Sequence, residues 1–169
     1  MSAPVKERCL GCALTLPAHG GPAHPYIGAS PACWALYGEL LAREYGPLNL
    51  PEGHRLTVDA YAVQHPGCPE RRAIQSVPVH LIGLHLVLER NEAPGRVTVR
   101  LGRIIAHLPK PHWLEPPQPN GALTVRHVLA AQADEYAERV REWATAVWRA
   151  WHPHHATVQA WLAHAERAG

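Results

Sequence analysis

Four cysteines and thirteen histidines are the side chains of this 169-residue sequence best suited to chemistry. Cys9 and Cys12 are separated by two residues, and the intervening Gly11 permits a tight turn. Both sulfurs can therefore reach one tetrahedral ion, at bond lengths of about 2.3 Å for zinc. Cys33 is the natural third ligand. The spacing predicts a metal site in the amino-terminal part of the chain.

A closed structural site needs a fourth protein ligand. His24 lies between Cys12 and Cys33 in the sequence Ala-His-Pro-Tyr, where an imidazole can turn inward. We therefore expect a structural zinc site whose ligands are Cys9, Cys12, His24 and Cys33. Cys68 is the main alternative for the fourth position, and His65 is another.

The cysteines also have interpretations without a metal. A CxxC pair can be a redox centre, but no βαβ pattern of the thioredoxin kind surrounds Cys9 and Cys12, so a redox protein is a minority hypothesis. Alternatively, these two are ordinary reduced thiols and Cys33 is a buried core cysteine.

A second set of polar residues lies within two strongly apolar segments, 55–66 and 77–88. Asp59 and His65 are six residues apart, roughly 9 Å along a helix axis, so they cannot chelate one ion alone. Ligands from both segments could hold a second metal that activates a water for hydrolysis. The other interpretation is a structural hydrogen-bond network in the core. The candidate catalytic residues are Asp59, His65, His80 and His112.

The elements that position these residues are predicted to be helices. Apolar residues recur at helical spacing along most of the chain, which is 47% apolar and 18% charged. We expect an all-α, single-domain bundle of about six or seven helices with an irregular amino-terminal lobe. The predicted parts are an irregular Cys/His lobe (1–29), central helices (30–108), a Pro-rich loop (109–121) and C-terminal helices (122–169).

Local signals place several candidate residues on these helices. Ser30 and Pro31 predict a helix start, so Cys33 should lie in a first turn, where the helix dipole favours a thiolate. Pro66 should end the next helix near His65. Pro78 predicts a new helix start or a kink.

Two further segments carry helical patterns. The segment 96–108 favours a helix, although 97–100 could be a short strand. The Trp-rich stripe within 134–151 is typical of a core face.

Charge and hydropathy exclude some classes of protein. A formal net charge of +2 is too small for a nucleic-acid footprint. The apolar run at 77–88 is broken by His80, Gly83 and His85 before it could span a membrane, and Met1–Arg8 lacks the apolar core of a signal peptide. We expect a soluble, cytoplasmic protein.

The sequence resembles an uncharacterised bacterial family, a domain of unknown function, along nearly its whole length. The similarity is carried by Cys9-Leu-Gly-Cys12, His24-Pro-Tyr26, Pro31-Ala-Cys-Trp34, Val58-Asp-Ala-Tyr-Ala-Val-Gln-His-Pro66 and His112-Trp-Leu-Glu-Pro116. The resemblance implies no activity and assigns no catalytic residue.

Together these patterns give one main functional hypothesis and one alternative. The main hypothesis is a zinc-binding protein with a structural Cys/His site, acting as a binding or accessory protein for a small molecule or a protein through a groove under the Pro-rich loop. The alternative is a metal-dependent hydrolase that uses Asp59, His65 and His80, with His112 nearby.

Overall fold

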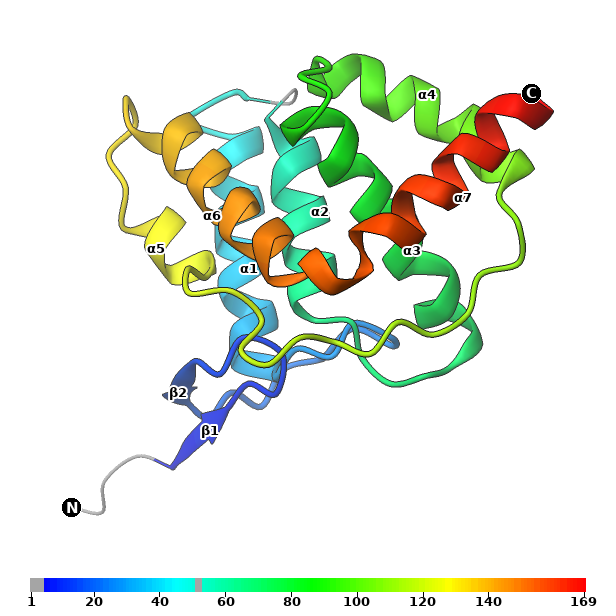
Figure 1. The fold of residues 1–169 in the computed structure, drawn as a ribbon. Coiled ribbons are helices and arrows are strands. Elements are labelled where there is room, and N and C mark those ends of the chain that lie inside the picture. Colours follow the sequence, from blue (N-terminus) through cyan, green and yellow to red (C-terminus); the bar gives the residue numbers. More distant parts are fainter. Residues whose placement is uncertain (1–4, 51–52) are drawn as a thin grey trace.

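Helices form nearly all of the regular structure in the computed structural model, which describes residues 5–50 and 53–169. The first four residues of the predicted lobe and residues 51–52 of the predicted central region lie outside the described part. The helices within it are α1 (Pro31–Tyr45), α2 (His54–Gln64), α3 (Arg71–Leu88), α4 (Pro94–His107), α5 (Val125–Leu129), α6 (Tyr136–Ala150) and α7 (His155–Ala168), with a 3-10 turn at His152–His154 (Figure 1). The predicted all-α class is confirmed.

The core is built around α2, which packs against α3 on one side and α6 on the other. Every residue from Asp59 to Pro66 is buried, as is every residue of α3 from Leu81 to Val87. The two apolar segments singled out in the sequence are therefore core segments. The Trp stripe of α6 is also buried, through Trp143 and Trp148, with Trp151 just beyond the helix end.

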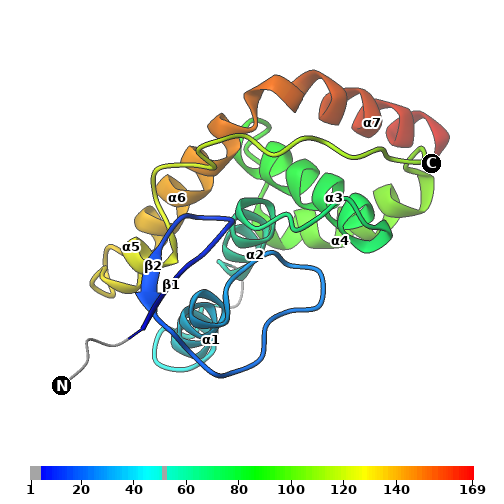
Figure 2. The same cartoon turned by 90° about the horizontal axis from the view of Figure 1, so that it is seen from below.

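The amino-terminal lobe is not wholly irregular, and the prediction that it would be was wrong in one respect. Two short strands, β1 (Lys6–Arg8) and β2 (Thr15–Pro17), pair antiparallel, and the CxxC segment lies in the turn between them. Figures 1 and 2 place this hairpin at one end of α1 and α2. Three-residue strands are too short to show the alternation that would reveal them in the sequence.

Pro78 does not divide the segment that contains it. Helix α3 continues from Arg71 to Leu88 with Pro78 inside. Residues 97–100, the alternative strand, belong to α4. Within the described part of the chain, no helix is both long enough and apolar enough to cross a membrane.

The Pro-rich segment 109–121 forms an extended loop, as predicted, and crosses the end of α2 (Figure 1). Asn120 Nδ2 donates hydrogen bonds to the carbonyl oxygens of Val63 and Gln64, at 2.8 and 3.1 Å. In return, Gln64 Nε2 donates to the carbonyl oxygens of Asn120 and Leu123. The two bonds donated by Asn120 satisfy carbonyl groups in the last turn of α2, where a helix lacks its own donors. The cavity beneath the loop, next to Gly67 and Cys68, holds only about 130 Å³.

Candidate metal centre

Three separate segments bring Cys9, Cys12, Cys33 and His65 together. Cys9 and Cys12 belong to the hairpin turn, Cys33 lies in the first turn of α1, and His65 directly follows the last residue of α2. One ligand atom from each of the four lies within 4.8 Å of the other three. Among the described residues, this is the only group of three or more Cys, His, Asp or Glu side chains close enough to hold a metal ion.

The hairpin turn is fixed by its own backbone. The Cys9 N–H donates to the Leu14 carbonyl at 2.8 Å, and the Ala13 N–H donates to the Cys9 carbonyl at 2.9 Å. Ala13 has a φ of 61°, in the left-handed region that reverses the chain direction. As a result, both sulfurs of the CxxC pair face the ends of α1 and α2.

Cys33 is positioned by the start of α1. The hydroxyl of Ser30 accepts a hydrogen bond from the Cys33 N–H at 3.3 Å, which is the capping contact predicted from the sequence. Glu7 Oε1 accepts a further bond from the Ala32 N–H at 2.7 Å and so ties the hairpin to this helix end. The Tyr61 hydroxyl donates to Cys33 Sγ at 3.6 Å. The Tyr61 hydroxyl and the helix dipole both favour negative charge on the sulfur.

His65 is held with one nitrogen free to bind. Its Nδ1 lies 2.8 Å from the Tyr61 carbonyl oxygen, which can only accept, so Nδ1 carries the proton. In the neutral ring, Nε2 then has a lone pair, and it lies 3.5 Å from Cys33 Sγ. A backbone carbonyl on the second ring nitrogen is the usual arrangement that orients a metal-binding histidine.

Gly11 allows the hairpin to sit directly against His65. A Cβ atom at this position would lie 2.4 Å from His65 Cδ2 and 2.7 Å from the Gln64 carbonyl oxygen. Only a residue without a side chain permits this approach. Gly11 therefore has a second role beyond the tight turn that its position in the CxxC pair suggests.

The three sulfurs influence one another strongly. Hydrogen bonds from the Cys12 and Cys33 thiols lower the pKa of Cys9, so one thiolate forms readily. The neighbouring Cys12 and Cys9 sulfurs, together with burial, raise the pKa of Cys33. Burial opposes the imidazolium form of His65, but the Cys12 and Cys9 sulfurs outweigh that effect and raise its pKa to about 9. Once one cysteine is a thiolate, ionisation of the other two is therefore favoured by a cation bound beside them.

His24 and Cys68, two residues proposed for the fourth position, do not join the group. The His24 ring packs against Trp34, with 5.0 Å between ring centroids, and its Nδ1 accepts backbone N–H bonds from Tyr26 and Ile27 at 3.4 and 3.2 Å. Cys68 is exposed. His65, the other alternative, lies with the three cysteines. Of the predicted set Cys9, Cys12, His24 and Cys33, the structure therefore brings the three cysteines together, with His65 rather than His24 beside them.

The four candidate catalytic residues are divided among three places. Asp59 and His80 contact each other, with 2.7 Å between Oδ1 and Nδ1, but His65 lies in the cysteine group. His112 is exposed and packs against Trp161 with 5.2 Å between ring centroids. The structure therefore does not bring Asp59, His65, His80 and His112 to one metal.

The comparisons with known proteins identify a family but no activity. A family model described as a family of unknown function, DUF5946, matches residues 7–152, a span that includes all four members of the cysteine and histidine group. The chain belongs to this family. Searches of curated proteins and of solved structures find no significant match.

Proposed function

We propose that this member of the family is a zinc protein in which one Zn²⁺, bound by Cys9, Cys12, Cys33 and His65, joins the hairpin to α1 and α2. Two sulfurs bound to one tetrahedral zinc at about 2.3 Å would be about 3.8 Å apart. The Cys12 and Cys33 sulfurs are 3.7 Å apart. The corresponding sulfur-to-nitrogen separation would be about 3.5 Å, and Cys33 Sγ lies 3.5 Å from His65 Nε2. This match is the observation that carries the proposal.

The ligand types favour zinc over harder ions. Three thiolates and one imidazole suit soft or borderline metals, whereas calcium and magnesium prefer oxygen ligands. Three sulfurs and one nitrogen form one of the usual sets for structural zinc. Bound zinc also supplies the positive charge that lets all three cysteines ionise together.

A structural role is favoured over a catalytic one because four protein ligands fill a tetrahedral site. Catalytic zinc usually keeps one position for water or substrate. Cys9, Cys33 and His65 are fully buried at 0% exposure, and Cys12 is half-buried, so water has little access to the ion. On this proposal the metal orders the lobe, and any binding or accessory activity uses another surface.

The test is the metal content of protein purified without added metal. We expect one zinc per chain in the wild type, and loss of that zinc in Cys33→Ser and in His65→Gln. Cys68→Ser is the matched cysteine control and His24→Gln the matched histidine control, and both should retain zinc. Loss of zinc in His24→Gln with retention in His65→Gln would overturn the proposed ligand set.

Cobalt substitution gives an independent measurement. Tetrahedral Co²⁺ bound by thiolates should absorb in the visible and near-ultraviolet, and His65→Gln should weaken or change that spectrum. A protein that contains no metal and whose Cys9 and Cys12 cycle between dithiol and disulfide would instead support the redox hypothesis.

A further inference from the structure

A second site lies beside the metal centre, in a cavity of about 230 Å³ between the loop before α1 and helices α1, α2 and α3. Its walls include His24 of the loop, Trp34 and Tyr37 of α1, and His80 of α3. It shares Tyr26, Ser76 and His80 with an adjoining depression of about 470 Å³. None of the residues that line the smaller cavity carries an acidic or a permanently charged basic side chain. The cavity therefore suits a small uncharged molecule.

His80 is held at this cavity by a buried carboxylate. Asp59 is fully buried, and it accepts hydrogen bonds from two guanidinium nitrogens of Arg55, one of them Nε at 2.8 Å. The same carboxylate lies 2.7 Å from His80 Nδ1. Gly83 leaves room for it, because a Cβ there would lie 2.2 Å from Asp59 Oδ2. The bidentate pair with Arg55 fixes the position of this carboxylate.

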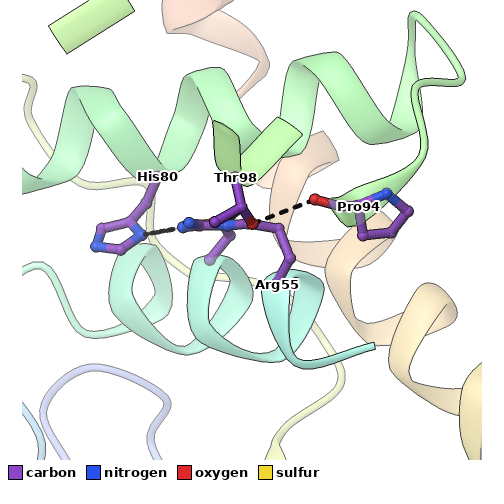
Figure 3. Close-up of polar contacts among 5 residues, drawn as sticks. Arg55, His80, Pro94 and Thr98 are labelled. Carbon is purple, nitrogen blue, oxygen red and sulfur yellow. Dashed lines mark hydrogen bonds and ion pairs between the residues drawn. The ribbon is translucent and has the colours of Figure 1, made fainter. Parts of the chain in front are cut away.

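The proton of neutral His80 is therefore on Nδ1. An ionised carboxylate only accepts hydrogen bonds, so the contact with Asp59 requires His80 Nδ1 to donate. The Arg55 guanidinium also approaches this nitrogen, at 3.3 Å (Figure 3), but an N–H group is no acceptor for it. The second ring nitrogen, Nε2, points away from Arg55 in Figure 3. It has no hydrogen-bond partner among the described residues, and its lone pair makes it a base.

His24 has the opposite tautomer. Its Nδ1 accepts the backbone N–H groups of Tyr26 and Ile27, so the proton of the neutral ring is on Nε2. Burial lowers the pKa of His24 and so favours this neutral form. The cavity thus has one imidazole with a free N–H donor and one with a free lone pair.

We propose that this cavity is the active site of a hydrolase for small uncharged carboxylic esters, with His80 as general base and His24 as hydrogen-bond donor to the carbonyl oxygen. Asp59 is a positioning residue, since it acts through His80. The site is separate from the zinc ligands and needs no metal, so it does not depend on the identity of the ion.

The reaction balances with water as the only co-reactant. His80 Nε2 takes a proton from water while the water oxygen forms a bond to the carbonyl carbon. The developing oxyanion is stabilised by the N–H of His24. The bond between the carbonyl carbon and the leaving oxygen then breaks, and His80 gives its proton to that oxygen. The products are a carboxylic acid and an alcohol, and the imidazolium formed in between is stabilised by Asp59.

The probe is p-nitrophenyl acetate, hydrolysed by the zinc-loaded full chain. We expect saturable hydrolysis, and a loss of at least tenfold in kcat/KM for His80→Gln and for His24→Phe. Because histidines on any surface hydrolyse activated esters slowly, His164→Gln is the control. His164 is exposed and on α7, and this variant should keep the wild-type rate. Absence of saturation in the wild type, or equal rates for His80→Gln and His164→Gln, would overturn the proposal.

A measurement on the unmodified protein guards against variants that fold poorly. Long-range proton–nitrogen NMR of the histidine rings should show Nδ1–H for His80 and Nε2–H for His24, and the reverse pair of tautomers would contradict the mechanism. In Asp59→Asn, the His80 ring should shift toward the Nε2–H tautomer, with a lower kcat and an unchanged KM. If Asp59→Asn only lowered stability, His80 would keep its Nδ1–H tautomer, and that result would contradict the positioning role.

Discussion

The two ring nitrogens of His65 have different partners, and this difference leaves Nε2 available to bind a metal. Nδ1 donates to the Tyr61 carbonyl in the last turn of α2, which also accepts the backbone N–H of His65, while Nε2 faces the sulfurs. His24 has no comparable support at the metal centre, because its Nδ1 already accepts from its own loop. The fourth ligand is therefore decided by backbone groups around each imidazole rather than by distance along the chain.

The sequence could supply three of the four ligands. Cys9 and Cys12 are close in sequence and Cys33 follows a clear helix-start signal, so local rules were sufficient for them. The choice between His24, Cys68 and His65 depended on how the hairpin packs against α2, which is a tertiary contact. The sequence did contain one signal. Gly11 and Gly67, which lies two residues after His65, are both glycines at positions where a Cβ would clash with a neighbouring segment.

Gly11→Ala is predicted to weaken zinc binding. The added methyl group would lie 2.4 Å from His65 Cδ2, so either the hairpin or the imidazole must move. A displacement of this kind should cost about 1 to 3 kcal/mol, which corresponds to a loss of zinc affinity of roughly fivefold to 150-fold. Competition with a chromophoric chelator measures it. Gly20→Ala is the matched control, because a Cβ at Gly20 meets nothing within 4 Å, and equal affinities for the two variants would refute the prediction.

Among the elements, the helices were predictable and the hairpin was not. Long amphipathic segments carry many apolar positions at one period, so the start of α1 and the Trp-rich core face of α6 could be predicted. Pro78 lies inside α3, so the new helix start that local rules allow there does not occur. The hairpin is held by the turn around the CxxC pair and by the hydrogen bond that Glu7 of β1 accepts from the Ala32 N–H at the start of α1. Neither contact leaves a periodic pattern in the sequence.

The contact between α2 and α3 depends on Gly83. Its place beside Asp59 lets a buried ion pair lie between two core helices without a clash. The pair itself is weak grounds for stability, because its ions lose hydration on burial. Its geometric effect is more specific, since it fixes the ring of His80 at the cavity.

Gly83→Ala is predicted to destabilise the fold despite the better helix propensity of alanine. The new Cβ would lie 2.2 Å from Asp59 Oδ2, so the carboxylate or the helix must shift, at a cost of about 1 to 3 kcal/mol or more. Gly102→Ala on the exposed face of α4 is the control, because no atom lies within 4 Å of its added methyl group. That control should gain up to about 1 kcal/mol. Urea unfolding of both variants decides the matter, and stabilisation by Gly83→Ala would show that the close approach is not rigid.

At the scale of the whole molecule, α2 connects the two proposed sites. His65 directly follows its last residue, and the helix itself carries Asp59 and Tyr61. Tyr61 lines the cavity and donates its hydroxyl to Cys33 Sγ. This one side chain therefore contacts both the cysteine group and the cavity. The lobe that zinc is proposed to order also contributes His24 and Tyr26 to the cavity. Zinc binding should therefore complete the second site without taking part in its chemistry.

Removal of zinc is predicted to disorder the lobe and leave the helical core folded. Apart from its ligands, the lobe is held by a hairpin of two three-residue strands and a few hydrogen bonds, whereas α2, α3 and α6 bury the large aromatic and aliphatic side chains. Zinc present at 1,000 times its Kd contributes about 4 kcal/mol, so a chelator should lower Tm by roughly 8 to 16 °C. Far-ultraviolet circular dichroism should change little, while backbone amides of residues 9–30 should exchange hydrogen much faster. Zinc added back should reverse both effects. Loss of most helical signal on chelation would instead make the metal part of the global fold, and unchanged exchange in the lobe would remove its structural role.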